Sequence, residues 1–105
     1  MIIRSVHLEG TVADGDRDAF DAHLRGPVSQ ALRTYPGLRQ LRLRRLVRGE
    51  EGAPAVYLAF DLYFDSLQAM DSALASPTRQ AVRDAMVAAR GLWTGRIFHL
   101  VYEET

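Results

Sequence analysis

The chain lacks several features that would narrow its function at once. It contains no cysteine, which excludes disulfides, thiolate catalysis and zinc–thiolate sites. No apolar run approaches the roughly 20 residues that a membrane span needs, and residues 1–5 are too short and polar for a signal peptide. We therefore expect a cytoplasmic protein with no membrane partner.

The chain also lacks an excess of charge of either sign. Thirteen basic and thirteen acidic residues give a formal net charge of zero. Such a chain has no net field to attract nucleic acid. Although residues 38–48 are rich in arginine, no aromatic RNA-stacking motif accompanies them, and we predict no nucleic-acid partner.

The usual signatures of metal and nucleotide sites are absent as well. The three histidines lie on separate segments, without a metal-ligand spacing such as H-x-x-x-H. There is no glycine-rich phosphate loop and no dinucleotide fingerprint. The sequence predicts no metal site and no bound cofactor.

What is present is enough for one small domain. The 105 residues fit a single domain spanning 1–105, and 48% of them are hydrophobic. A domain of this size buries only roughly 60–68% of its extended-chain surface. Burial against a partner chain would therefore add substantially to its stability.

Hydrophobic periodicity predicts four strands and two helices. The strands are expected at Ile2–Glu9, Leu38–Arg48, Val56–Phe64 and Leu92–Glu103. The first helix follows a loop at 10–15, runs from about Asp16 to Pro36-Gly37, and should be kinked or split by Pro27. The second begins at Asp65 or Ser66 and restarts at Ser76-Pro77, where a proline follows an N-cap residue.

The resulting order, βαββαβ, predicts an α+β ferredoxin-like fold with a four-stranded antiparallel sheet. Right-handed crossovers place both helices on one side of that sheet. We expect the helix side to receive Val56, Leu58, Phe60, Leu62 and Phe64. We expect the helix-free side to hold Tyr57, Ala59, Asp61 and Tyr63, together with Trp93, Ile97 and Val101.

That helix-free surface is too apolar to face water comfortably. The simplest way to cover it is a second copy of the chain. The sequence therefore predicts a homodimer in which two sheets meet to form a closed α/β barrel with a partly polar interior.

Two groups of residues resemble the EthD family of dimeric α/β-barrel proteins. One is Phe64-Asp65-Ser66-Leu67 followed by Ala73-Leu74-Ala75-Ser76-Pro77 and the helix to Met86. The other is Gly26-Pro27-Val28 with Leu32 and Pro36-Gly37-Leu38. The family usually has a histidine directly before the Gly-Pro pair, whereas this chain has Arg25 there and His23 two residues earlier.

The resemblance implies a dimeric barrel with a small hydrophobic or aromatic molecule as ligand. It also implies a role in degradation or polyketide-type biosynthesis, with cofactor-free oxidation, cyclisation, decarboxylation or isomerisation as the chemistry. Monooxygenase-like relatives share the fold.

Three residues are candidates for proton transfer. Strand alternation puts His7 with Ser5 and Glu9 on the expected cavity side, where an imidazole can exchange a proton near neutral pH. Asp61 lies among aromatic neighbours and is either a base, an anchor for substrate, or half of a structural ion pair. His23 flanks the apolar stripe of the first helix and either enters a cleft or stays on the helix surface.

Six further residues are candidates for substrate binding. Arg42 and Arg44 are expected to face Asp61 across a hairpin and to hold an oxyanion. Arg25 offers a fixed fork of donors. The others lie on strands expected to border the cavity: Tyr57, Tyr63 and His99.

Three functions remain open at this point. The chain is a cofactor-independent enzyme, such as a monooxygenase, cyclase or isomerase, or a non-catalytic module that binds a hydrophobic metabolite. The third alternative is a dimerisation domain with a filled interior. The fold alone does not choose among them.

Overall fold

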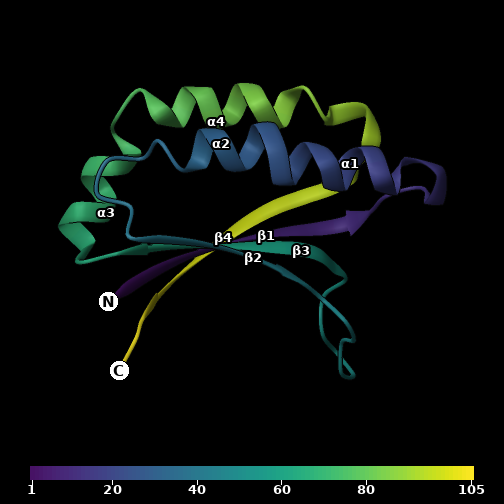
Figure 1. The fold of residues 1–105 in the computed structure, drawn as a ribbon. Helices are drawn as coiled ribbons and strands as arrows, with labels where there is room; N and C mark the ends of the chain where they lie inside the picture. The colour runs from purple at the N-terminus through teal and green to yellow at the C-terminus, as the bar shows by residue number, and fades with distance from the viewer.

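The predicted ferredoxin-like fold is confirmed. In the computed structural model, which describes residues 1–105, four antiparallel strands form one sheet in the order β2-β3-β1-β4. The strands are β1 (Ile2–Thr11), β2 (Gln40–Arg45), β3 (Val56–Phe64) and β4 (Thr94–Glu103). All helices lie on one side of this sheet, and its other side carries none (Figure 1). No helix is long and apolar enough to cross a membrane.

The first predicted helix contains the irregularity that Pro27 predicts. It consists of η1 (Asp14–Asp16), α1 (Arg17–His23), a π-helical turn η2 (Leu24–Val28) and α2 (Ser29–Leu32). Pro27 lies inside the π turn, where its missing N–H and its ring disturb regular α-helical bonding. The helix continues in line through this turn, so the proline changes the hydrogen bonding without splitting the helix (Figure 1).

The second predicted helix begins at the predicted N-cap. Ser66 accepts a hydrogen bond from the backbone N–H of Ala69, which starts α3 (Leu67–Leu74). After the break at Ser76-Pro77, α4 (Thr78–Val87) runs beside α1 and α2, and η3 (Arg90–Leu92) leads into β4 (Figure 1).

The core lies between the helices and the sheet. The apolar stripe of the first helix is buried there with Leu58, Phe60, Leu62 and Phe64 of the predicted β3 row, whereas Val56 is only half-buried. The most deeply buried side chains of the core are Leu8, Phe20, Leu24, Val28, Leu62 and Phe64.

Strand register shows which residues share a side of the sheet. Leu8, Val6 and Arg4 pair with Leu58, Phe60 and Leu62, so all of these face the helices. His7, Ser5 and Ile3 pair with Ala59, Asp61 and Tyr63 on the helix-free side.

The predicted side is wrong for Tyr57. The β1–β3 register shifts between Leu8 and Glu9, and Glu9 pairs with Val56, which leaves Tyr57 as the extra residue of a bulge. The bulge turns Tyr57 toward the helices, where its ring meets Phe20 edge to face and its hydroxyl donates to Asp21 Oδ1 at 2.6 Å.

The predicted side is also wrong for the last strand. Val6 pairs with His99 and Leu8 with Ile97, which places Ile97, His99 and Val101 on the helix side. Trp93 precedes β4 and stacks on Phe20. The helix-free side receives Phe98, Leu100 and Tyr102 instead, because they pair with His7, Ser5 and Ile3.

Two glycines face each other across β1 and β4. Gly10 pairs with Gly95, and both have positive φ angles, 140° and 157°. A Cβ on Gly10 would overlap the carbonyl oxygen of Thr94, and one on Gly95 would overlap that of Glu9. Only glycine fits at either position without moving a strand.

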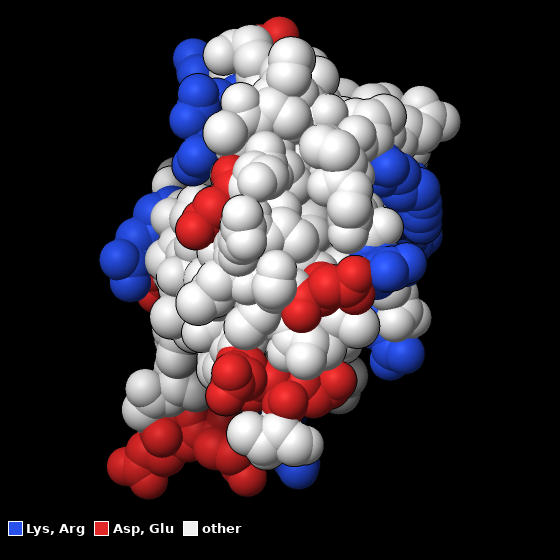
Figure 2. Space-filling view, turned by 90° about the vertical axis from the view of Figure 1, so that its left-hand side faces the viewer, with Lys and Arg blue, Asp and Glu red and all other residues white.

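The charges on the surface are mixed. Figure 2 looks at the end of the molecule where α3 and the two termini lie. Acidic side chains gather toward the bottom of this face and basic ones lie along its flanks, with uncharged surface between them. No broad patch of one sign covers this end.

Candidate functional site

The structure contains two places where candidate functional side chains meet, and they lie on opposite sides of the sheet. One is a polar cluster on the helix-free side, formed by Ser5, His7, Arg44 and Asp61. The other is a pocket on the helix side, between the sheet and α4. We refer to them as the polar cluster and the α4 pocket.

Asp61 is the centre of the polar cluster. Arg44 donates two hydrogen bonds to it, from Nε to Oδ2 at 2.6 Å and from NH2 to Oδ1 at 2.8 Å. The Asp61 side chain is only 8% exposed, whereas that of Arg44 is 55% exposed. The carboxylate is therefore buried within a single subunit, and its charge is compensated by a forked donor.

Ser5 connects Asp61 to His7. Its hydroxyl donates to Asp61 Oδ1 at 2.7 Å, and its Oγ lies 3.0 Å from His7 Nε2. Because the hydroxyl proton is directed to Asp61, His7 Nε2 must carry a proton and donate to Ser5. The serine thus lies between the histidine and the carboxylate. In a nucleophilic triad the histidine takes that middle position, so this arrangement does not activate Ser5.

The pKa values of the cluster follow from burial and from Arg44. Burial alone would raise the pKa of Asp61, but hydrogen bonds from Arg44 and Ser5 lower it below its usual value. Burial lowers the pKa of His7, Arg44 lowers it further, and Asp61 offsets part of the change. At neutral pH the cluster therefore holds a carboxylate, a guanidinium and a neutral imidazole.

The cluster joins three of the predicted site residues, His7, Arg44 and Asp61. The ion pair between Asp61 and Arg44 corresponds to the structural alternative for Asp61. Of the other two predicted residues on this side, Arg42 lies over the Tyr63 ring at 5.8 Å. The roles assigned to these five residues in catalysis or substrate binding stay predictions.

The remaining predicted residues lie elsewhere. His23 donates from Nε2 to the backbone oxygen of Ala85 at 2.6 Å and so ties α1 to α4. Arg25 is exposed in the π turn. Tyr57 and Arg45 both hydrogen-bond the Asp21 carboxylate on the helix side. None of His23, Arg25 and Tyr57 contacts the polar cluster.

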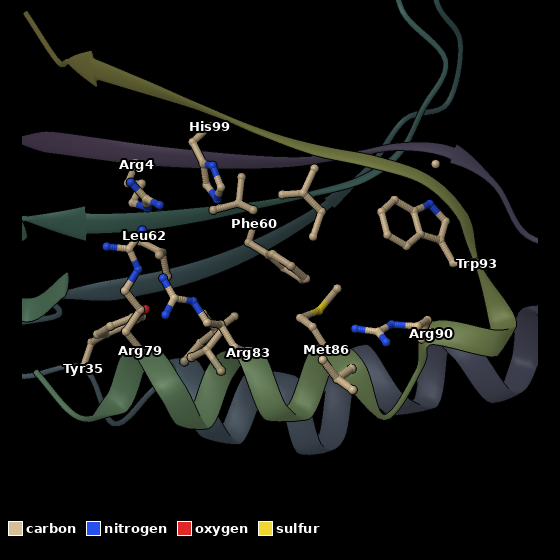
Figure 3. Close-up of a pocket in the computed structure, with 16 residues that line it drawn as sticks. Arg4, Tyr35, Phe60, Leu62, Arg79, Arg83, Met86, Arg90, Trp93 and His99 are labelled. Atoms are coloured by element: carbon tan, nitrogen blue, oxygen red, sulfur yellow. The ribbon is translucent and has the colours of Figure 1, made fainter. Parts of the chain in front are cut away.

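The α4 pocket has a volume of about 650 Å³. Its floor is formed by β1, β3 and β4 and its opposite wall by α4, with Trp93 at one end (Figure 3). Ten of its sixteen lining residues are hydrophobic. A cavity of this size and character is suited to a small, largely apolar molecule.

Sequence reasoning found only one residue of this pocket, His99, among its candidates. It missed the other polar residues that line it, which are Arg4, Tyr35, Arg79, Arg83 and Arg90. The available signal was Arg4, a charged residue on the otherwise apolar row of β1. An arginine in such a row indicates either a bulge or a cavity beneath the strand.

The chain is similar in structure to several proteins of known fold. One is an EthD family protein from Bacillus halodurans, with 26% identity over 100% of both chains and a TM-score of 0.74. The resemblance to the EthD family is confirmed.

Two other solved structures share the fold of this chain. A dimeric ferredoxin-like protein of unknown function from Jannaschia sp. CCS1 is 21% identical, with 98% of each chain covered and a TM-score of 0.66. A candidate antibiotic biosynthesis monooxygenase from Deinococcus radiodurans is 22% identical over 100% of this chain and 93% of its own, with a TM-score of 0.61. No family model and no curated protein matches the sequence.

Proposed function

We propose that this EthD-like protein is a homodimer in which each subunit binds a small aromatic or hydrophobic molecule in its α4 pocket. The observation that carries the proposal is the pocket itself, about 650 Å³ in volume and lined mainly by hydrophobic residues. Ligand pockets of proteins fall between roughly 300 and 1,000 Å³. The third function left open by the sequence, a dimerisation domain with a filled interior, concerns the space between the two sheets of a dimer, which lies on the other side of the sheet from this pocket.

The position of the pocket supports one ligand site per subunit. All of its walls come from one chain, so a site exists before any partner is added. The helix-free side of the sheet stays available for the second subunit. Dimeric ferredoxin-like proteins among the structural neighbours support this assembly.

We further propose that the protein acts on this ligand as an enzyme without a bound cofactor. His99 is the histidine of the pocket, and burial followed by repulsion from Arg4 and Arg79 lowers its pKa. A neutral imidazole next to a bound phenol or ketone can accept a proton from it. The similarity to a candidate monooxygenase supports an oxidation or a related proton-abstraction reaction.

Trp93 makes ligand binding directly measurable. It is the single tryptophan of the chain, it lines the α4 pocket, and its buried Nε1–H has no hydrogen-bond partner. We expect aromatic acids, quinones and polyketide-like phenols to change its fluorescence and to raise the melting temperature. A ligand at 100 times its Kd stabilises the folded state by about 2.7 kcal/mol.

A pair of variants on α4 tests the location of the site. Val82→Phe fills the pocket and should abolish binding, whereas Ala81→Phe, on the exposed side of the same helix, should leave it unchanged. Equal binding by both variants would refute the assignment. Chromatography of the same mixtures distinguishes an enzyme, which forms product over time, from a binding module, which returns the ligand unaltered.

A further inference from the structure

The α4 pocket has an unbalanced charge. Four arginines line it, Arg4, Arg79, Arg83 and Arg90, and no aspartate or glutamate is among its sixteen lining residues. None of these four takes part in the five ion pairs of the molecule, which involve Arg17, Arg39, Arg44, Arg45 and Arg96. Arginines outside the pocket also lack ion pairs, such as Arg42 on β2, but only in the pocket do four of them line one cavity without a carboxylate.

The unpaired charge is greatest at the end of the pocket opposite Arg90 and Trp93 (Figure 3). Arg4 projects from the sheet and Arg79 from α4, and their side chains converge near Tyr35 and His99 (Figure 3). Burial lowers the pKa of Arg4, and the nearby charge of Arg79 lowers it further. Two neighbouring cations in a partly desolvated site repel each other, and an anion placed between them would remove that cost.

The chemistry of this end favours a carboxylate. A guanidinium presents planar, forked donors that match the two oxygens of a carboxylate. Tyr35 is 6% exposed, and burial raises the pKa of its hydroxyl despite the nearby Arg4 and Arg79. That hydroxyl therefore stays protonated and can donate a further hydrogen bond.

The other end of the pocket is mainly apolar, although the Arg90 side chain also lies there beside Trp93 (Figure 3). Phe60 and Met86 face each other across the cavity, and Trp93 closes it (Figure 3). Aromatic rings and a thioether together make a favourable surface for a flat ring system. The ligand should consequently have one charged end and one aromatic end.

We propose that the ligand of the α4 pocket is an aromatic carboxylate. Its carboxylate lies between Arg4 and Arg79, and its ring system extends toward Met86 and Trp93. This inference rests on the proposed function, because it specifies the class of molecule that the pocket binds.

Calorimetric titration with two isosteric probes tests it. 2-Naphthoate carries the carboxylate, and 2-naphthamide has the same shape without the charge. We expect the wild-type protein to bind 2-naphthoate at least tenfold more tightly. Arg79→Gln should abolish this preference while still binding 2-naphthamide, and Arg79→Lys should restore part of it. Arg33→Gln, at an exposed position outside the pocket, is the matched control and should behave as wild type.

The possible outcomes separate the two proposals. Equal affinity of the wild-type protein for both probes would overturn the anionic ligand and leave the pocket as a binding site. A preference that persists in both Arg79→Gln and Arg4→Gln would overturn the assigned position of the carboxylate. If neither probe binds and the aromatic ligand screen also fails, both proposals are wrong.

Discussion

At the scale of single residues, the polar cluster shows which of two arginines on β2 forms the ion pair with Asp61. Arg42 lies directly opposite Asp61 in the β2–β3 register, yet Arg44, opposite Ala59, makes the ion pair. Diagonal neighbours on a sheet are about 7–8 Å apart, within reach of a long side chain. Arg42 makes the equivalent diagonal contact with the ring of Tyr63. The sequence predicted both arginines as donors to Asp61, and only Arg44 makes that contact.

This choice predicts different stabilities for two matched variants. Arg44→Ala leaves the buried carboxylate of Asp61 without its forked donor and should lower the free energy of unfolding by about 2 kcal/mol. Arg42→Ala removes only a partly exposed contact with an aromatic ring and should cost about 0.5–1 kcal/mol. Urea unfolding at pH 7 and a fixed protein concentration measures both. Equal losses would contradict the assignment.

The difference between the two variants should also depend on pH. The pKa of Asp61 is lower in the folded protein than in the unfolded chain, so the unfolded chain binds more protons at acid pH. The stabilisation is then complete above the unfolded value, about 3.9, and is lost as the pH falls through the folded value. Below that pH, Arg44→Ala and Arg42→Ala should become similar in stability.

At the scale of elements, the alternation of side chains along a strand predicted correctly which side of the sheet some residues occupy. In β3, Leu58, Phe60, Leu62 and Phe64 form one buried row, as expected, because polar or small residues alternate with them. The pattern failed at Tyr57 because a bulge adds one residue without a signature in the sequence. It failed in β4 because apolar residues such as Ile97 and Phe98 occupy both sides, so alternation cannot assign a side.

The pairing of β4 predicts a large effect for one small substitution. Gly95→Ala introduces a Cβ that would overlap the carbonyl oxygen of Glu9, and it also requires a positive φ. The loss of stability should be at least about 2 kcal/mol. Gly91→Ala is the control, because a Cβ there meets nothing within 4 Å. Thermal unfolding of the two variants compares them, and a nearly unchanged melting temperature for Gly95→Ala would show that the strands separate at little cost.

At the scale of the whole molecule, the sheet divides two environments. Its helix side contains the core and the α4 pocket, and its other side displays the polar cluster together with Phe98, Leu100 and Tyr102. Leu100 and Tyr102 are 41% and 50% exposed, and they belong to an edge strand with unpaired backbone groups. Composition and periodicity could predict that this side needs a cover. They could not predict that the pocket would lie on the opposite side, because the pocket depends on how far α4 stands from β4.

The homodimer can be tested with a charge placed on that exposed surface. We expect the wild-type protein to have the mass of a dimer in light scattering at micromolar concentration. Leu100→Glu should convert it to a monomer, because the carboxylate would be buried without a partner. Leu67→Glu alters another exposed leucine, on α3 and away from this side of the sheet, and this variant should remain dimeric. A wild-type monomer, or a dimeric Leu100→Glu variant, would refute the proposed interface.

The glycine pair between β1 and β4 has a consequence that reaches both environments. With Gly10 and Gly95 opposite each other, His99 belongs to the ligand compartment, and Phe98 and Leu100 belong to the subunit boundary. A shift of β4 by one residue would move every side chain to the other side of the sheet. The ligand compartment would then lose the His99 imidazole, and the subunit boundary would lose Phe98 and Leu100. The absence of two side chains therefore fixes which chemistry each compartment receives.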